Sequence, residues 1–369
     1  MLWSSVFEQI HMKPPSIKDI AQALNISIGT VDRALHGRSD VSPKTRARVL
    51  KKAEQLGYRP NLAARSLKLN RRVRIGIYFP RDIASFFDPL RNGVRSAASA
   101  STGVNVELVF RTFPRLDEGD LELLTADAAE KFDGILVTPG NPERMGPVLS
   151  ALARRGVAVI CVASDAPRSE RLASVSTDAH AGGAIAAELF SRTIQKPGHL
   201  ATITGELTTL DHAEKLRGFA ANLAVFAPHL SLLPAIESHE QPKVAYRQAI
   251  ALLSRKPYPL GIYISTANSI PVLRAIEEKN LLGEVQIIAT DLFPELVPYI
   301  ESGRILATLY QRPFTQGKTA LEILVRYLLD GVTPELHTRL APHIILRSNL
   351  ALFASYITEG ADTPSLSEK

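Results

Sequence analysis

Seven short apolar runs, separated by segments with helical periodicity, constrain the fold of this chain from residue 73 onward. Each run is four to six residues long and rich in β-branched side chains, as expected for a buried strand. The runs cover residues 74–79, 105–110, 134–137, 157–162, 200–203, 261–264 and 286–289. Strands that alternate with helices predict parallel sheets with crossover helices, so we expect an α/β body.

The residues that follow these runs are the candidates for a small-molecule site, because ligands of parallel sheets bind beyond the carboxyl ends of the strands. These segments hold aromatic rings, amides, carboxylates and hydroxyls. Aromatic faces and hydrogen-bonding groups together suit a sugar or polyol. The candidate ligand-binding residues, some of them further along the chain, are Phe86, Phe87, Asn141, Asp165, Lys215, Asn268, Asp291 and Gln311.

Several of these candidates also have a purely structural interpretation. Phe86 and Phe87 are typical of a core, and Asp291 could cap the helix that follows it. Lys215 could be a solvated charge on a helix, and Gln311 could satisfy a backbone group where the chain crosses between domains. The combination therefore predicts a binding site more strongly than any single member does.

Basic charge is concentrated at the N-terminal end of the chain. Residues 1–74 hold 15 Lys and Arg against 5 Asp and Glu, whereas residues 75–369 hold 28 against 32. A short basic unit joined to a larger, mildly acidic one is typical of a nucleic-acid-binding head on a separate body. Charge alone leaves a solvated basic face as the alternative.

The basic segment contains three predicted helices, over residues 17–24, 28–35 and 43–56. Two short helices joined by a tight turn and followed by a third predict a helix-turn-helix head within residues 16–59. The start signals are Ser16 with Asp19, which resemble a capping box, then Ser27, then Ser42 with Pro43. The stop signals are Asn25 and Gly57.

The second predicted helix carries the residues that would read DNA, since such a helix lies in the major groove with its N-terminal residues facing base edges. Arg33 can bond bidentately to guanine, and Ile28 can contact a thymine methyl group. Asp32 either accepts from a cytosine amine or fixes Arg33. The candidate DNA-binding residues of the head are Ser16, Ser27, Ile28, Gly29, Thr30, Asp32, Arg33 and His36.

The stretch PSIKDIAQALNISIGTVDRALHGRSDVSPKTRARVLKKAEQLGYRPNLAARSLK resembles the head and hinge of the lactose-repressor (LacI/GalR) family from end to end. The resemblance implies a hinge at residues 60–72 that becomes helical when two subunits meet on DNA. It makes Leu67 an apolar wedge in the minor groove, which kinks the duplex. Similarity to the purine-repressor branch gives Lys68 a minor-groove role as well. Asn61 and Arg65 complete the predicted hinge contacts, with a helix packed on its own core as the alternative.

From about residue 73 to 350 the chain resembles the ribose-binding-like periplasmic proteins (type I), the second half of this family's design. The resemblance implies two Rossmann-like subdomains in an effector-binding domain at 73–358. We expect the N-subdomain at about 73–170 and 312–336, and the C-subdomain at about 171–311 and 337–358. In this resemblance Lys215 replaces a common arginine, a compact cation in place of a bidentate fork. The positions implied to contact ligand are Phe86, Phe87, Asn141, Asp291 and Gln311.

Other classes of protein are disfavoured. The chain lacks GxxxxGK[ST], GxGxxG after a strand, GxSxG and HExxH, and its histidines do not pair at metal-ligand spacing, so we expect no enzyme, cofactor or metal. Cys161 lies in an apolar run and is expected to be buried. No apolar run is long enough for a membrane helix, and residues 1–15 read as a tail without secretory features. A transport binding protein and a sugar-active enzyme remain the alternatives.

The expected function is therefore a cytoplasmic, nucleoid-associated transcription regulator that binds a pseudo-palindromic operator in double-stranded DNA. A repressor of carbohydrate metabolism or uptake, controlled by a sugar-like effector, is the favoured interpretation. A corepressor-dependent repressor, or an activator, responding to a non-sugar metabolite is the alternative. Residues 359–369 form a polar tail without leucine heptads, so we expect a homodimer.

Overall fold

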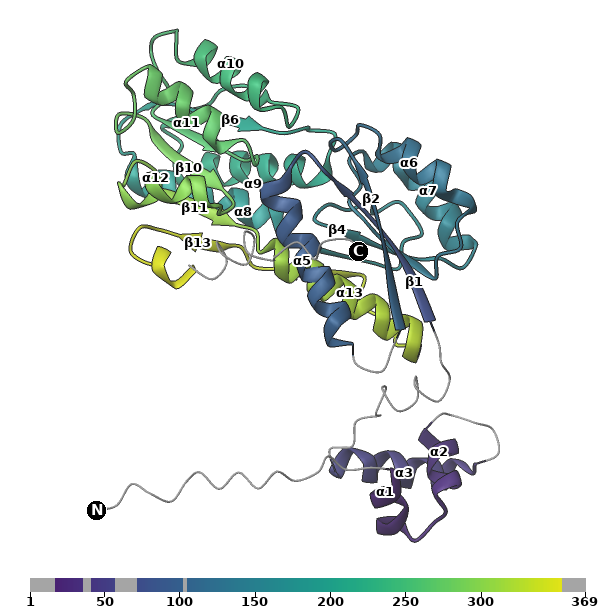
Figure 1. Ribbon diagram of the computed structural model, residues 1–369. Helices are drawn as coiled ribbons and strands as arrows, with labels where there is room; N and C mark the ends of the chain where they lie inside the picture. The colour runs from purple at the N-terminus through teal and green to yellow at the C-terminus, as the bar shows by residue number, and fades with distance from the viewer. Residues whose placement is uncertain (1–16, 36–40, 57–71, 102–104, 354–369) are drawn as a thin grey trace, which may run out of the picture. The chain divides into compact units, whose positions relative to one another are not determined.

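The computed structural model describes residues 17–35, 41–56, 72–101 and 105–353. The chain divides into two compact units between residues 70 and 71 (Figure 1). The first unit contains the helices α1 (Ile17–Leu24), α2 (Ile28–Leu35) and α3 (Pro43–Gln55). All of the described strands lie in the second unit.

The three helices of the first unit form as the sequence predicts, for local reasons. Asn25 adopts a left-handed backbone with φ 52°, which ends α1. The Ser27 hydroxyl then accepts a hydrogen bond from the backbone N–H of Thr30 at 3.0 Å, which caps α2. Ser42 caps α3 in the same way. The small core that joins the helices consists of Ile20, Ala21, Val31, Ala34, Val41, Val49 and Ala53.

The first subdomain of the second unit is built on a parallel six-stranded sheet with the order β12-β5-β4-β3-β1-β2. Its strands are β1 (Arg72–Pro80), β2 (Asn105–Phe113), β3 (Gly134–Val137), β4 (Ala158–Val162), β5 (Ala173–Thr177) and β12 (His337–Leu340). One face packs against α5 (Ala84–Ala100) and α13 (Pro313–Asp330). The other face packs against α6 (Asp120–Ala126), which leads into η1 (Asp127–Ala129), and α7 (Pro142–Arg154).

The second subdomain repeats this plan with the sheet order β13-β11-β10-β9-β6-β7, and β8 also pairs with β6. Its strands are β6 (Gly198–Thr204), β7 (Leu230–Leu232), β8 (Ile236–Glu237), β9 (Gly261–Ile264), β10 (Gln286–Thr290), β11 (Ala307–Tyr310) and β13 (His343–Ile345). Its helices are α8 (Ala179–Thr193), α9 (Leu210–Phe226), α10 (Pro242–Leu252), α11 (Ser269–Glu278), α12 (Val297–Glu301), η2 (Pro294–Leu296) and η3 (Leu350–Phe353). Helices α8 and α9 share one core and α10 and α11 share the other.

The predicted fold class is confirmed, and all seven predicted strands are present, but the predicted subdomain boundaries need correction. Strands β5 and β12 belong to the first sheet, so the chain crosses between subdomains after Thr177 and after Leu340, not near 170 and 336. Strand β5 mixes alanine, serine and threonine with one valine, and β12 is a partly exposed edge strand. Neither produces the continuous apolar run that marks a buried parallel strand. Strand β13 pairs antiparallel with β11, which the expectation of parallel sheets did not include.

Reciprocal glycines hold α9 against α8 at backbone contact. A Cβ atom on Gly183 of α8 would overlap the carbonyl oxygen of Lys215, and one on Gly218 of α9 would overlap that of His180. Glycine is required at both positions because a backbone atom cannot move aside as a flexible side chain can. The position of the start of α9, which faces the cleft described below, is thereby fixed by the packing of the helix pair.

Two further expectations concern the apolar segments. Cys161 in β4 is fully buried, as predicted, and burial raises the pKa of its thiol to about 12, which keeps the thiol protonated. Within the ranges described by the structure, no helix is long and apolar enough to cross a membrane.

Candidate functional site

The exposed N-terminal end of α2 is the candidate DNA-reading surface of the first unit. Ile28 is 49% exposed, although it is a large apolar side chain, whereas Val31 and Ala34 of the same helix are buried in the core. A Cβ atom on Gly29 would meet no atom closer than 3.9 Å, so packing within the unit does not require glycine there. The surface can therefore approach a ligand closely without rearranging the core.

Some predicted DNA contacts lie on this surface and others lie outside the described residues. Ser27 and Thr30 form the cap of α2, with 2.8 Å between their hydroxyl oxygens. Asp32 and Arg33 lie on α2 and are partly buried, so their predicted contacts with bases stay predictions. The predicted residues outside the described ranges are Ser16, His36, Asn61, Arg65, Leu67 and Lys68.

A cleft between the two subdomains of the second unit is the candidate effector site. The space not occupied by atoms measures about 440 Å³, part of it open to solvent. The first subdomain contributes Ile83, Phe86, Phe87, Leu116, Thr138, Ala163 and Ser164. The second contributes Thr209, Asp211, His212, Lys215, Glu240, Thr266, Ala267, Asp291 and Gln311.

The wall from the first subdomain is mainly apolar. Phe86 and Phe87 stand at the start of α5 with their ring centroids 5.0 Å apart and an interplanar angle of 77°. Both rings also belong to the core beneath α5, so the structural and the functional interpretations of this pair are compatible. Thr138 and Ser164 follow β3 and β4, and their buried hydroxyl oxygens have no hydrogen-bond partner among the described residues.

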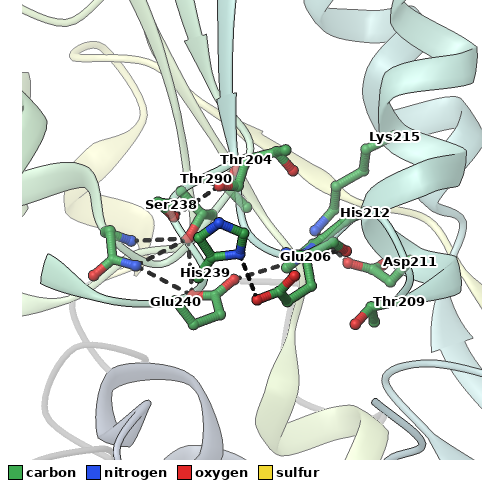
Figure 2. A network of polar contacts seen from close by, with 12 residues as sticks. Thr204, Glu206, Thr209, Asp211, His212, Lys215, Ser238, His239, Glu240 and Thr290 are labelled. Atoms are coloured by element: carbon green, nitrogen blue, oxygen red, sulfur yellow. Dashed lines mark hydrogen bonds and ion pairs between the residues drawn. The ribbon is translucent and has the colours of Figure 1, made fainter. Parts of the chain in front are cut away.

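The wall from the second subdomain is polar, and three of its side chains come from the start of α9 (Figure 2). The Lys215 ammonium donates to Asp211 Oδ2 at 2.6 Å, one helical turn away. The His212 ring lies with Nε2 3.2 Å from Glu240 Oε1. The structural interpretation of Lys215 as a solvated helix charge is therefore wrong, because its side chain is 5% exposed and ion-paired.

Asp291 is the ionisable residue of the cleft lining whose pKa is most clearly shifted. It follows β10 with a left-handed φ of 70°, and its carboxylate accepts from the Gln311 side-chain amide at 3.1 and 3.0 Å. Burial raises the pKa of Asp291 to about 6, against the opposing effects of the Lys215 ammonium and the Gln311 hydrogen bonds. Its oxygens face Gln311 and not the N–H groups of a following helix, so Asp291 is not simply a helix cap.

The structure does not bring three of the predicted residues to the cleft lining. Asn141 caps α7 by accepting from Arg144 N at 3.3 Å, and Asp165 is occupied by a buried ion pair with Arg171. Asn268 lies one layer behind the lining, where its amide donates to Glu240 Oε2 at 3.2 Å. All three follow a strand, but being near a strand end does not determine which way a short side chain points.

Asp211, His212 and Glu240 line the cleft but were missed by sequence reasoning. Asp211 stands four residues before Lys215, a spacing that places the two side chains on one helix face and could have predicted the pair. Glu240 follows β8, which has only two residues and no apolar run. Its left-handed φ of 50° directs its side chain inward, and no sequence pattern marks that conformation.

A hydrogen bond between Thr209 and Gly140 joins the two subdomains across the cleft. The Thr209 hydroxyl, at the start of α9, donates to the backbone carbonyl of Gly140, which follows β3, at 2.7 Å. Both groups are buried, so the bond is protected from water. The subdomains can separate at this point only when this hydrogen bond breaks, so the bond is a determinant of how far the cleft opens.

Thr209→Val removes this donor and preserves the shape of the side chain. A typical neutral hydrogen bond contributes about 1 kcal/mol, so we expect the open fraction to rise about fivefold. Spin labels on the exposed positions 168 and 225, one in each subdomain, would report this as a shift toward longer distances. Thr193→Val, the same change at the exposed end of α8, should leave the distances unaltered. An unchanged distribution for Thr209→Val would show that this bond does not restrain the cleft.

Comparison with known proteins defines the class. Residues 16–61 match the model of the bacterial regulatory proteins of the lacI family, and residues 75–331 match a periplasmic binding protein domain. A helix-turn-helix head followed by two parallel α/β sheets of the type I periplasmic-binding-protein fold defines a DNA-binding transcription regulator with an effector domain. The chain belongs to the LacI family, whose members are transcription regulators and not enzymes.

Two relatives align with this chain over most of their own length. Catabolite control protein A from Priestia megaterium is 25% identical over 327 residues, which cover 85% of this chain and 92% of that protein. The HTH-type transcriptional repressor PurR from Aliivibrio fischeri (strain MJ11) is 27% identical over 352 residues, which cover 91% of this chain and 98% of that protein.

Solved structures resemble the second unit. GanP, a glucose-galactose binding protein from Geobacillus stearothermophilus, has a TM-score of 0.68 and 25% identity, covering 76% of this chain and 99% of its own. A solute-binding protein of an ABC transporter from Agrobacterium vitis, bound with α-D-tagatopyranose, has a TM-score of 0.71 and 20% identity. The match covers 77% of this chain and 99% of that protein. The second of these supports the fold alone.

Proposed function

We propose that this LacI-family regulator represses genes of carbohydrate metabolism or uptake and releases its operator when a small sugar-like effector binds the cleft. The observation that carries the proposal is the lining of the cleft, which sets two aromatic rings on one wall against carboxylates and an ammonium group on the other. Aromatic faces cover the C–H surface of a sugar ring, and the charged groups bond its hydroxyls. The likeness to a glucose-galactose binding protein supports the same ligand class.

The effector controls DNA binding in this proposal through its different affinity for the open and closed arrangements of the cleft. The hinge at residues 60–72 transmits the change to two heads of a homodimer, whose spacing matches the half-sites of a pseudo-palindromic operator. The cytoplasm, and the nucleoid within it, is the proposed location. Corepression or activation by a non-sugar metabolite is the alternative and predicts the opposite response of operator affinity to effector.

The proposed residue roles combine the positions of the described residues with the family resemblance of the sequence. Arg33 and Ile28 read bases from the start of α2, and Leu67 and Lys68 contact the minor groove. In the cleft, Phe86 and Phe87 stack on the effector while hydrogen bonds come from the opposite wall. The residues proposed for those bonds are Asp211, His212, Lys215, Glu240, Asp291 and Gln311.

Arg33→Ala tests the proposed DNA contact in the full chain. A bidentate contact to a base contributes about 1–3 kcal/mol, so we expect a loss of roughly 10- to 100-fold in affinity for a duplex selected from a random pool by the wild-type chain. Fluorescence anisotropy over a series of salt concentrations would measure it, and affinity should fall steeply with salt for both proteins.

The matched control is Arg255→Ala, which removes an exposed arginine from the second unit. It should bind the selected duplex as the wild type does. Equal affinity of Arg33→Ala and wild type would rule out the proposed base contact, and a flat salt response would rule out binding through many phosphates.

A further inference from the structure

Negative charge is in excess in the cleft. Its ionisable lining residues are three carboxylates, Asp211, Glu240 and Asp291, with one ammonium group, Lys215, and one imidazole, His212. The backbone N–H of Glu206 lies 3.0 Å from His212 Nδ1, closer than the Glu206 carbonyl at 3.2 Å. No arginine occurs among the described residues of the lining.

The Lys215 ammonium of the cleft lining is already engaged. The Lys215 ammonium lies 2.6 Å from Asp211 Oδ2, and both side chains are largely buried. A ligand carboxylate or phosphate would have to compete with Asp211 for this ammonium. It would also approach two other carboxylates in a poorly screened environment, where repulsion between like charges is strong. The cleft therefore disfavours an anionic effector.

Asp291 is the carboxylate with unused capacity. Its hydrogen bonds come from the Gln311 amide and backbone N–H, and no cationic group within 4.0 Å pairs with it in the described part of the chain. Each carboxylate oxygen can accept two hydrogen bonds, and Oδ2 accepts one. A buried carboxylate without a direct ion pair is costly, so an ammonium group brought by a ligand would be strongly favoured.

The opposite wall suits the same kind of ligand. The ring faces of Phe86 and Phe87 attract cations as well as the C–H surface of a sugar. The buried hydroxyls of Thr138 and Ser164 have no hydrogen-bond partner in the described part of the chain, so each can bond a ligand hydroxyl. Among the described residues, two buried hydroxyls on one side and a carboxylate without a direct ion pair on the other define where the polar groups of an effector would bind.

We propose that the effector is a small polyhydroxylated molecule carrying one ammonium group, an amino sugar or amino polyol, whose ammonium binds Asp291 and whose hydroxyls bond Thr138 and Ser164. This inference rests on the proposed function, because it specifies the effector of the same cleft. It narrows that effector from any sugar derivative to a cationic one.

The test uses the full chain and matched sugars in the gluco, galacto and manno series. Each series compares the 2-amino sugar, its N-acetyl derivative, the parent sugar and the uronic acid at pH 7.5, by thermal shift and then by calorimetry. We expect the amino sugar of at least one series to bind at least tenfold more tightly than the other three members. Asp291→Asn should abolish that preference, whereas Glu284→Gln, the same change at an exposed position, should keep it.

Each other outcome overturns the proposal. Tighter binding of a parent sugar or N-acetyl derivative would leave the sugar-effector function intact but exclude the ammonium. Preference for a uronic acid would contradict the charge argument, and so would an amino-sugar preference that survives in Asp291→Asn. Failure of every amino sugar to bind would exclude the proposed class of effector. Binding of the selected duplex by the same chain would separately test the DNA-binding function.

Discussion

Deletion of residues 1–71 is expected to abolish operator binding and leave effector binding unchanged. The deletion removes the helix-turn-helix unit and the proposed hinge, which hold all of the proposed DNA contacts. The remaining residues 72–369 carry 30 Lys and Arg against 32 Asp and Glu, so they offer no excess of positive charge to phosphates. Specific binding commonly exceeds non-specific binding by at least about 1,000-fold, and we expect a loss of at least that size.

The truncated chain should fold, because residues 71–369 form a compact unit with four buried clusters of its own. Anisotropy with the selected duplex and calorimetry with an effector identified on the full chain would measure the two activities separately. Circular dichroism would verify folding. Retained operator affinity would overturn the domain assignment, and loss of effector affinity in a folded protein would show that the head contributes to the cleft.

The order of helices and strands was largely predictable, since each has a local cause that the sequence displays. The caps at Ser27 and Ser42 and the left-handed Asn25 mark the helices of the head. Strands buried on both faces, such as β3 and β9, require uninterrupted apolar residues. Edge strands face solvent on part of their surface, so β12 and the short β7 and β8 contain polar residues and could not be recognised.

The cleft was predictable in outline and not in detail. Strand ends indicate where a ligand binds, and this predicted Phe86, Phe87 and Asp291. Which side chains face the ligand depends on backbone conformation and on competing partners. Arg171 forms a buried ion pair with Asp165, which keeps Asp165 from the cleft. The two residues are six positions apart, and no periodicity in the sequence predicts the pair. Glu240 reaches the cleft through a left-handed backbone conformation that the sequence does not reveal.

Asp291 connects the electrostatics of the cleft to the stability of the fold. Its pKa is raised by burial from 3.8 to about 6, despite the nearby Lys215 ammonium. A carboxyl group whose pKa is higher in the folded state stabilises the protein at low pH. That contribution is lost as pH rises from about 4 through about 6, because the folded state then has to ionise a buried group. The wild-type protein is therefore less stable above pH 6 than it would be with a neutral group at this position.

Asp291→Asn should accordingly stabilise the protein at neutral pH while removing its proposed response to an effector. Asparagine tolerates the left-handed backbone at this position and can still accept from Gln311. The shift of about two pKa units corresponds to a gain on the order of 3 kcal/mol in the free energy of unfolding above pH 7, and to almost none near pH 4. Urea unfolding of variant and wild type across this pH range would measure the difference.

The pH dependence of the difference separates this cause from a general improvement in packing, which would stabilise the variant equally at every pH. Glu284→Gln changes the net charge identically at an exposed site and should show no such dependence. If the difference in the free energy of unfolding between Asp291→Asn and wild type is flat or negative, the buried carboxylate is not destabilising. The proposal that this carboxylate favours a cationic ligand would then be overturned. A stabilised variant that no longer responds to effector would instead mean that the protein sacrifices stability to keep a charged binding group in its cleft.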